Sequence, residues 1–308
     1  MEHERTPSLL SVLVTFRRPD DLAAMLAALR AQSRPPDRLV VVDNAPTPQT
    51  RAVVAGGYPT AEYVAAPENL GPAGGIALGM ERLLATAADD DWILTLDDDD
   101  PPCLPTLLED LLAHAVDAAA RDRSVGAVGA DGARCDRRRG RVDRVPDAEL
   151  RGDGDVDVDW VGGDHHPLYA ARALRTVGPM QADLFFGFEE LELGLRLRDA
   201  GYRIVVPGSV CRARRAATGD RGAPTAPSRR LGDVSWRRYY SLRNLVRILI
   251  DRGALLGALR VTAVVGLAKP LANVLRAPGA AGAHLRVNAR ACADAWTGRI
   301  GRTVEPTP

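Results

Sequence analysis

Four consecutive carboxylates close an apolar run in the segment WILTLDDDDPP, residues 92–102. Like charges this close repel one another, so each carboxylate is stabilised by water or by a cation. Asp97 and Asp99 are spaced D-x-D, and both side chains can coordinate one divalent ion such as Mg²⁺ or Mn²⁺. Taken alone, the segment fits equally well an exposed acidic turn before a helix that starts near Pro105.

A glycine-rich turn, PENLGPAGG at residues 67–75, leads into a predicted helix. Such a turn can bring backbone N–H groups and a helix N-terminus towards an anion. It follows the third predicted strand and lacks the GxxxxGK[ST] pattern, which disfavours both a Rossmann fingerprint and a P-loop. Because glycines often only make turns, this signal is weak by itself.

The elements that position these residues alternate between strand and helix. Apolar runs predict strands at residues 8–16, 38–42, 62–65, 92–96, 124–129 and 202–206. Helical periodicity predicts helices from Pro19 to before Pro35, from about Pro48, and at 76–87, 104–120 and 189–200. This alternation is typical of a mostly parallel sheet covered by helices, in which ligands collect beyond the carboxyl ends of the strands.

The rest of the chain is less regular. Residues 131–159 are rich in charge and glycine and are interpreted as a solvated hairpin or loop. Residues 213–234 indicate a mobile or partner-ordered segment, and residues 236–251 and 254–276 are predicted to be unusually apolar helices.

Composition limits the class of protein. The 308 residues include 46% hydrophobic and 26% charged residues, which indicates a globular chain. Forty basic and forty acidic residues cancel, which argues against nucleic-acid binding by bulk charge. The four cysteines are isolated, the N-terminus has no apolar signal region, and no run of about 18 apolar residues occurs, so we expect a cytoplasmic protein.

The combined pattern resembles the inverting GT-A glycosyltransferases of family 2, in particular the rhamnosyl- and galactofuranosyltransferase-like branch. The resemblance covers roughly residues 8–250, in the pieces SVLVTFRRPDDLAAMLAAL, LVVVDNA, ENLGPAGGIALGM, WILTLDDDDPP, VGPMQADLFFGFEELELGLRLRDAGYRI and WRRYYSLRNL. It implies a GT-A (nucleotide-diphospho-sugar transferase) fold, with a mostly parallel mixed sheet, flanking helices and a helical C-terminal extension. We divide the chain into a catalytic domain at 1–212 (nucleotide-sugar half about 1–100, acceptor half about 101–212), a flexible linker at 213–234 and a helical region at 235–308.

The resemblance also implies the function. We expect a metal-dependent inverting enzyme that moves a sugar from a UDP- or dTDP-linked donor to a hydroxyl of a glycan, glycolipid or glycosylated metabolite. Two alternatives stay open: a nucleotidyltransferase of related fold, and a non-catalytic sugar- or membrane-binding relative. The first usually has a basic glycine-rich signature near the first strand, which SVLVTFRRPDD lacks.

The same resemblance assigns the donor site. Thr15, Arg18 and Asp43 are expected to line the nucleotide pocket, and Asn69, Gly71 and Gly74 to border it. Asp98 is expected against the ribose or donor sugar. Asp97 and Asp99 are the expected ligands of a Mn²⁺ or Mg²⁺ ion, with Asp99 as the direct one, while Asp100 only approaches the next helix.

Inversion requires a base that takes the proton of the acceptor hydroxyl. The family pattern has two carboxylates at a helix start, which correspond to Glu189 and Glu190 here. We assign Glu190 as the base and Glu189 as the second choice, because a neighbouring negative charge raises pKa and basicity. Glu192 and Arg196 are expected to form an i,i+4 ion pair on the face of this helix. The alternative is that the two glutamates are only the acidic start of a surface helix.

Two departures from the family stand out. Many relatives place a histidine metal ligand about two dozen residues after the base, where this chain reads VCRAR at 210–214. Three options could replace this histidine. Cys211 is a poor substitute as a metal ligand, an arginine neutralises the diphosphate, or the ion has fewer protein ligands. His165 and His166 stand where relatives have small apolar residues, and either touch the acceptor or are incidental.

The basic, apolar residues 239–276 fit two arrangements. They form amphipathic helices on the anionic inner face of the cell membrane, or helices packed on the catalytic domain or in a homodimer.

Overall fold

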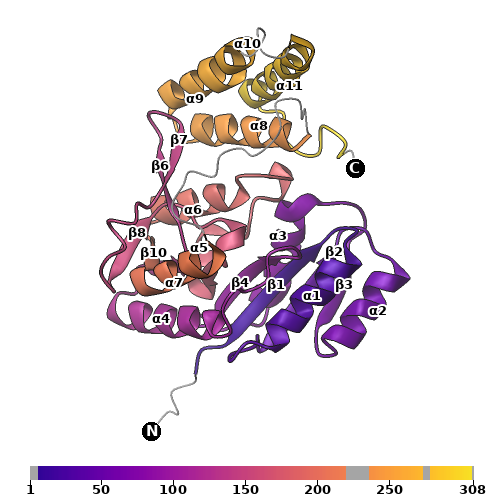
Figure 1. The fold of residues 1–308 in the computed structure, drawn as a ribbon, viewed down its shortest axis with the longest axis vertical. Coiled ribbons are helices and arrows are strands. Elements are labelled where there is room, and N and C mark those ends of the chain that lie inside the picture. The colour runs from indigo at the N-terminus through magenta and orange to yellow at the C-terminus, as the bar shows by residue number, and fades with distance from the viewer. Residues whose placement is uncertain (1–5, 220–235, 273–277, 307–308) are drawn as a thin grey trace.

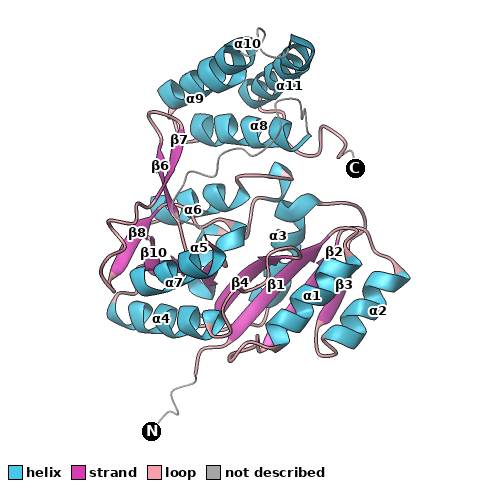
Figure 2. Ribbon diagram, in the orientation of Figure 1, coloured by secondary structure: helices cyan, strands magenta, loops and turns pink. Residues whose placement is uncertain are grey.

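The computed structural model describes residues 6–219, 236–272 and 278–306. These residues form an eight-stranded mixed sheet with helices packed against it (Figure 2). The strand order is β3-β2-β1-β4-β9-β5-β10-β8. The strands are β1 Leu9–Thr15, β2 Arg38–Asp43, β3 Glu62–Ala65, β4 Trp92–Asp97, β5 Val125–Val128, β8 Asp155–Val158, β9 Leu168–Ala170 and β10 Arg203–Pro207. Strands β3, β2, β1 and β4 are parallel, as are β5 and β10, while β9 and β8 run antiparallel to their neighbours. The predicted mostly parallel mixed sheet is confirmed.

The first half of the sheet follows the sequence pattern closely. Every residue of β1 is buried, as expected of a strand covered on both faces. Helix α1 (Pro19–Arg30) begins with proline in its first turn and buries the four residues Leu22, Met25, Leu26 and Leu29 at helical spacing. Helix α2 (Pro48–Gly57) is capped by the Thr47 hydroxyl, which accepts from the Thr50 amide.

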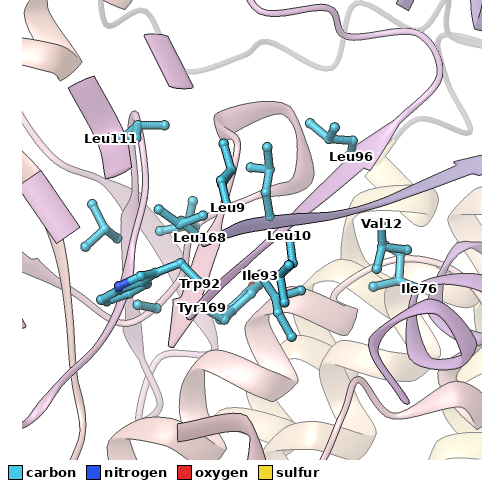
Figure 3. Packing of buried hydrophobic residues seen from close by; sticks show 14 of the residues in the cluster. Leu9, Leu10, Val12, Ile76, Trp92, Ile93, Leu96, Leu111, Leu168 and Tyr169 are labelled. Atoms are coloured by element: carbon cyan, nitrogen blue, oxygen red, sulfur yellow. The ribbon is translucent and has the colours of Figure 1, made fainter. Parts of the chain in front are cut away.

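Two further helices complete this half. Helix α3 (Gly71–Leu84) packs on β1, β2 and β4, and helix α4 (Leu107–Arg121) packs on β5 and β9. Helix α3 starts five residues before the predicted Ile76, so the glycines of the turn belong to its first turns. The main core lies between these layers, where Trp92 and Tyr169 pack among leucines of β1, β4 and β9 (Figure 3).

Residues 131–159 combine a hairpin with an edge strand. Strands β6 (Ala133–Asp136) and β7 (Arg141–Arg144) pair antiparallel, which confirms the predicted hairpin. Strand β8, which was expected as loop, pairs with β10 at the edge of the main sheet. The aspartates of this segment gave it the composition of a loop. Charged side chains are, however, also common on edge strands.

The second half positions the later motifs. It contains the short turns η1 (Gly163–His165) and η2 (Ala182–Leu184) and the helices α5 (Ala171–Val177), α6 (Glu189–Asp199) and α7 (Gly208–Thr218). Helix α7 runs past residue 212, so residues 213–218 are helical, contrary to the predicted flexible linker. The physical reason is that Arg215 is buried in ion pairs with Asp131 and Asp147, which composition does not reveal. The remaining linker residues, 220–234, lie outside the described residues.

The C-terminal region is helical, as predicted. It consists of α8 (Trp236–Asp251), α9 (Leu255–Val261), the π-helical η3 (Thr262–Ala268), α10 (Lys269–Ala272) and α11 (Pro278–Thr297). Helix α8 packs on α9 and α11 and lies nearest to the sheet, while α9, α10 and α11 form the far end of the molecule (Figure 1). Across the described ranges, no helix combines the length and apolar character needed to cross a membrane.

Candidate active site

A cavity of about 700 Å³ opens where β1 and β4 end and where α3 and α6 begin. Its walls come from segments far apart in the sequence. They include Thr15, Phe16, Arg18, Asn44, Asn69, Gly71, Asp97, Asp98, Asp99, Trp160, Gly163, Asp164, Phe185, Phe186, Phe188, Glu189, Glu190, Trp236, Arg237 and Ser241. The parallel register of β1 and β4, which pairs Val14 with Asp97, therefore brings the first and fourth predicted strand ends together.

Asp98 joins the ends of these two strands. It accepts hydrogen bonds from the Thr15 hydroxyl at 2.6 Å, the Phe16 amide at 3.3 Å and the Arg18 guanidinium at 3.3 Å. Burial raises the pKa of Asp98, and these donors oppose the shift. Three of the predicted donor-site residues, Thr15, Arg18 and Asp98, thus form one bonded unit on the cavity wall.

Asp97 and Asp99 point into different surroundings. Asp99 has a side chain that is 53% exposed and forms an ion pair with Arg18. Asp97 is partly buried on the cavity wall, and burial together with the charges of Asp99, Asp98, Asp100 and Asp164 raises its pKa to about 7. Asp97 is therefore the carboxylate that a cation would stabilise most.

Glu189 and Glu190 open helix α6 and are both buried, although they line the cavity. Burial, and then the charge of Asp97, raises the pKa of Glu189 to about 8. The pKa of Glu190 is raised well above its ordinary range by burial and by the charges of Glu189 and Asp97. A Cβ at Gly163 would lie 2.9 Å from Glu190 Oε1 and 3.0 Å from Asp97 Oδ2, so both carboxylates converge on this glycine.

The backbone before the two glutamates is strained. Phe185 and Phe188 have φ values of 64° and 67°, a region that bulky residues rarely occupy. Helix α8 holds this loop in place. The Asn244 amide donates to the carbonyls of Leu184, Phe186 and Gly187 at 2.8–3.0 Å, and Arg243 donates to that of Leu184 at 2.8 Å. Over-determined strain of this kind is common at functional sites.

Glu192, one turn into α6, accepts from Arg196 at 2.7 Å, which confirms the predicted i,i+4 pair. The pair is not on a surface helix face, however. Glu192 is buried and also accepts from Arg252 at 3.1 Å, so the start of α6 is tied to the loop after α8. The alternative of a surface helix is therefore wrong for this end of α6.

The glycine turn closes another side of the cavity. Asn69 and Gly71 line it, and Gly71 has a φ of 68° and packs so closely that a Cβ would lie 2.1 Å from the Phe185 carbonyl oxygen. The Gly71 amide is bound by Asn69 Oδ1 at 2.9 Å and the Ala73 amide by the Phe185 carbonyl at 3.4 Å. These two first-turn amides are therefore used within the protein and not offered to an anion.

Asp43 and Gly74 are not among the residues that line the cavity. Asp43 is fully buried and accepts from the Tyr63 hydroxyl at 2.8 Å and from the Ala45 amide. A Cβ at Gly74 would lie 2.8 Å from Leu70 Cβ, so this glycine serves packing. The neighbouring Asn44 lines the cavity instead and donates to the Gly71 carbonyl at 3.0 Å.

An aromatic wall of Phe186, Phe188, Trp160 and Trp236 lines the cavity, and neither tryptophan could be assigned to the site from the sequence alone. Trp160 lies 5.9 Å from Phe188, centroid to centroid, and Trp236 lies 4.8 Å from Phe186. Phe185 also borders the cavity, but it is buried and packs against Tyr240 of α8. Arg237 lies over both Phe186 and Trp236. Only the tertiary fold brings Trp160, from the loop after β8, to Phe188 at the start of α6.

The residues around the position of the missing family histidine do not line the cavity. Cys211 is fully buried beside the Asp131–Arg215 ion pair and does not line the cavity. Arg214 is buried behind Asp164 and donates to its carbonyl at 2.8 Å. His165 and His166 lie near Arg214, and neither lines the cavity.

The donor set suits a hard divalent cation. Asp97, with its raised pKa, and Asp99 supply carboxylate oxygens at the cavity. Within the described residues, no group of three or more His, Cys, Asp or Glu is arranged to hold an ion by itself. Mg²⁺ and Mn²⁺ need only one or two protein carboxylates when substrate phosphates and water supply the other ligands. The residues therefore fit an ion that binds together with a diphosphate.

The fold is that of the GT-A nucleotide-diphospho-sugar transferases. The mannosyltransferase PcManGT from Pyrobaculum calidifontis, solved with GDP-Man and Mn²⁺, aligns with a TM-score of 0.51 at 19% identity and covers 96% of this chain and 76% of its own. GalNAc-T7, solved with UDP, GalNAc and Mn²⁺, aligns with a TM-score of 0.56 at 12% identity over 80% of this chain and 48% of its own. At these identities the likeness concerns the fold.

Sequence comparison gives the family. The model of glycosyl transferase family 2 matches residues 11–141. The galactofuranosyltransferase GlfT1 of Mycolicibacterium smegmatis is 37% identical over 204 residues, which are 64% of this chain and 67% of that protein. GlfT1 of Mycobacterium tuberculosis H37Rv is 36% identical over 203 residues, 64% and 66% of the two chains. The chain spans about two thirds of the length of these relatives. It belongs to glycosyl transferase family 2 and is a glycosyltransferase; the nucleotidyltransferase alternative is not favoured.

Proposed function

We propose that this protein transfers galactofuranose from a UDP-linked donor to a hydroxyl of a glycan or glycolipid, with inversion at the anomeric carbon. The observation that carries the proposal is the convergence of Glu190 and Asp97 on Gly163, which sets a buried base beside the donor carboxylates. Similarity to GlfT1 supports the sugar, and the GT-A fold supports the nucleotide donor.

The donor end is formed by the unit of Thr15, Arg18 and Asp98. Asp98 is held by three donors, so its orientation is fixed before a ligand enters. A carboxylate fixed in this way accepts hydrogen bonds from ribose or sugar hydroxyls at little entropic cost. Asn69 and Gly71 border the same cavity.

Asp97 and Asp99 would hold the divalent ion together with the donor diphosphate. A bound ion supplies positive charge that stabilises the oxygen of the departing diphosphate. The protein keeps Asp97 partly buried, which strengthens its attraction to a cation over that of an exposed carboxylate. Arg18 forms an ion pair with Asp99 on the lining of the same cavity.

Glu190 serves as the general base. Its carboxylate takes the proton of the acceptor hydroxyl while that oxygen bonds to the anomeric carbon and the bond to the UDP oxygen breaks. The raised pKa makes Glu190 a stronger base than an exposed glutamate once it is ionised. Glu189 supports it by adding negative charge beside it and is the second choice for the role.

The aromatic wall binds the acceptor in this proposal. The ring pairs Trp160 with Phe188 and Phe186 with Trp236 line the same cavity as the two glutamates. Aromatic faces pack against the apolar faces of sugar rings, while the glutamates and Asp164 offer acceptors for hydroxyls. We place the reaction on the cytoplasmic side, in contact with the membrane that would carry a glycolipid acceptor.

The test is a donor panel. Purified protein is incubated with UDP-galactofuranose, UDP-galactose, UDP-glucose and dTDP-rhamnose, with Mn²⁺ or with EDTA, and nucleotide release is measured. We expect release only with Mn²⁺ and fastest from UDP-galactofuranose. Faster release from another donor would overturn the sugar assignment. Binding of every donor without release would favour the non-catalytic alternative.

A further inference from the structure

The outermost helix of the molecule presents an apolar surface to solvent. Elements α9, η3 and α10 follow one another without a break from Leu255 to Ala272. The exposed large hydrophobic residues of the described chain all lie on this stretch or beside it. They are Leu255, Leu256, Leu259, Val264, Leu267, Leu271 and, on α11, Trp296.

The spacing shows that this is one face of a helix. Leu255, Leu259, Val264, Leu267 and Leu271 recur every three to five residues, as on one side of a helical stretch. The opposite side, with Gly257, Ala258, Val261 and Gly266, is buried against α8 and α11. Small residues thus make the intramolecular contact, and the large ones are left outside.

Positive charge surrounds this face. Arg260 and Lys269 are exposed on the same helical stretch. The tip of the β6–β7 hairpin adds Arg138 and Arg139, because Gly257 lets the hairpin approach so closely that a Cβ there would lie 2.0 Å from the Arg137 carbonyl oxygen. A hollow between the hairpin and α9 is lined by Arg138, Arg139, Arg260, Leu256 and Asp136, the last of which pairs with Arg139.

The sequence of this region contains no acid. Residues 252–293 hold six arginines and lysines and no aspartate or glutamate, in a chain whose overall charges cancel. Trp296 adds an aromatic side chain at the border, 38% exposed, with its indole nitrogen donating to Thr262 Oγ1 at 3.1 Å. Basic side chains around leucines, with a tryptophan at the rim, are typical of helices that lie in a membrane interface.

We propose that α9, η3 and α10 form a docking surface for an anionic lipid bilayer, on which the protein lies with this helix parallel to the membrane plane. Charge complementarity favours this occupant over a second copy of the chain, because two copies would bring the same arginines and Lys269 together. The surface is smaller than residues 239–276: helix α8 is not part of it, since Tyr239, Tyr240, Leu242 and Val246 of that helix are buried.

The orientation matters for the proposed reaction. Helix α8 lies between the docking helix and the rest of the molecule, and its first turn supplies Trp236 and Arg237 to the cavity (Figure 1). Docking therefore places the aromatic wall one helix layer from the lipid. This bears on the proposed glycolipid acceptor, but the docking itself does not depend on the identity of the transferred sugar.

Vesicle flotation tests the docking. The full chain is mixed with vesicles of phosphatidylcholine alone or of phosphatidylcholine and phosphatidylglycerol in equal parts, at low and high NaCl. We expect flotation with the anionic vesicles, weakened by salt, and little with the neutral ones. Equal flotation with both vesicles, or none with either, would overturn the proposal.

Two variants separate the apolar and the charged contributions. In Leu256→Ser/Leu259→Ser the replaced side chains, 69% and 53% exposed, already lie in water, so folding is retained. We expect affinity for anionic vesicles to fall by roughly tenfold or more. Arg260→Glu should weaken it about fivefold, and the matched reversal Arg123→Glu, at the far side of α4, should leave it unchanged. Equal losses for Arg260→Glu and Arg123→Glu would contradict a local docking surface.

A footprint gives independent evidence. Lys269 is the only lysine in the 308 residues, so an amine-reactive reagent reports on this helix by peptide mapping, with the N-terminal amine as internal reference. Anionic vesicles should protect Lys269 and not the N-terminus. Protection in the absence of lipid, rising with protein concentration together with a dimer in sedimentation, would assign the face to a second copy. UDP release by Leu256→Ser/Leu259→Ser without lipid should equal that of the wild type, so failure of docking and failure of the glycosyltransferase proposal are distinguished.

Discussion

The carboxylates of Glu190 and Asp97 both approach Gly163 on the lining of the cavity. A Cβ at Gly163 would lie 2.9 Å from Glu190 Oε1 and 3.0 Å from Asp97 Oδ2, although the two residues are 93 positions apart in the sequence. The missing side chain at Gly163 therefore lets a base and a donor-side carboxylate converge. The proposed reaction depends on this convergence.

Gly163→Ala tests the convergence directly. The added methyl group would push both carboxylates apart without touching backbone, so we expect the turnover number to fall by roughly tenfold or more while the melting temperature changes little. The control is Gly154→Ala, whose Cβ would meet nothing within 4 Å. Equal activity of the two variants would show that the space at Gly163 is not used in the reaction.

Stability should depend on pH in the absence of a divalent ion. The pKa values of Asp97 and Glu189 are raised to about 7 and about 8, whereas they ionise near 3.8 and 4.5 when unfolded. The folded state then holds more protons than the unfolded state, so their contribution to the free energy of unfolding is present below pH 4 and lost as pH rises through about 8. Thermal melts in EDTA across this range, with and without Mn²⁺, measure it.

Asp97→Asn isolates one of these carboxylates. It removes a partly buried charge whose pKa is raised, so we expect this variant to melt higher than the wild type at pH 8 in EDTA and to be inactive. The exposed Asp20→Asn is the control and should show no such gain. A variant that melts lower than the wild type at every pH would mean that Asp97 is stabilised by the protein rather than strained by it.

Asn244 is predicted to be a positioning residue. Its amide holds the carbonyls of Leu184, Phe186 and Gly187, just before the two glutamates. Asn244→Ala should lower the turnover number by roughly tenfold with a nearly unchanged KM for the donor, because the base moves and the donor unit does not.

The control for Asn244 is Asn288, another fully buried asparagine, whose amide holds the carbonyls of Val265 and Gly266 far from the cavity. Asn288→Ala should cost about as much stability, in the range of 1–3 kcal/mol for unpaired buried carbonyls, and leave UDP release intact. Parallel losses of activity in both variants would reduce the role of Asn244 to stability alone.

Thr15→Val probes the donor unit. The hydroxyl donates to Asp98 at 2.6 Å inside the protein, and its removal leaves a buried carboxylate oxygen with one donor fewer. We expect the KM for the nucleotide sugar to rise by about tenfold with a smaller change in the turnover number, measured by initial rates of UDP release. An unchanged KM would separate Asp98 from donor binding.

Much of this site could be predicted from the sequence because the carboxyl ends of parallel strands lie at the same edge of a sheet. Thr15, Asp97 and Asp98 follow buried strands, and adjacent strands bring them together without further information. Glu189 and Glu190 came from a motif and lie on the same cavity. The strand and helix pattern likewise predicted β1 to β5, α6 and α8 to within a few residues.

What the sequence could not supply depends on tertiary contacts. Trp160 and Trp236 meet the cavity only after the sheet and α8 have packed. Helix α7 is held by the buried pair of Arg215 with Asp131, and β8 by its pairing with β10, and neither contact has a local signal. Asp43 is a strand-end carboxylate that was expected in the nucleotide pocket but does not line the cavity. It accepts instead from Tyr63 on the neighbouring strand β3.

The rate of UDP release from UDP-galactofuranose by Glu190→Gln tests most directly whether Glu190 is the general base. The amide keeps the size of the side chain and cannot take a proton, so we expect the rate to fall by roughly 10²–10⁴-fold with unchanged affinity for UDP. Glu189→Gln should fall much less, because that residue only raises the basicity of its neighbour. Near wild-type release by Glu190→Gln, or a larger loss in Glu189→Gln, would contradict the assignment of Glu190 as the base.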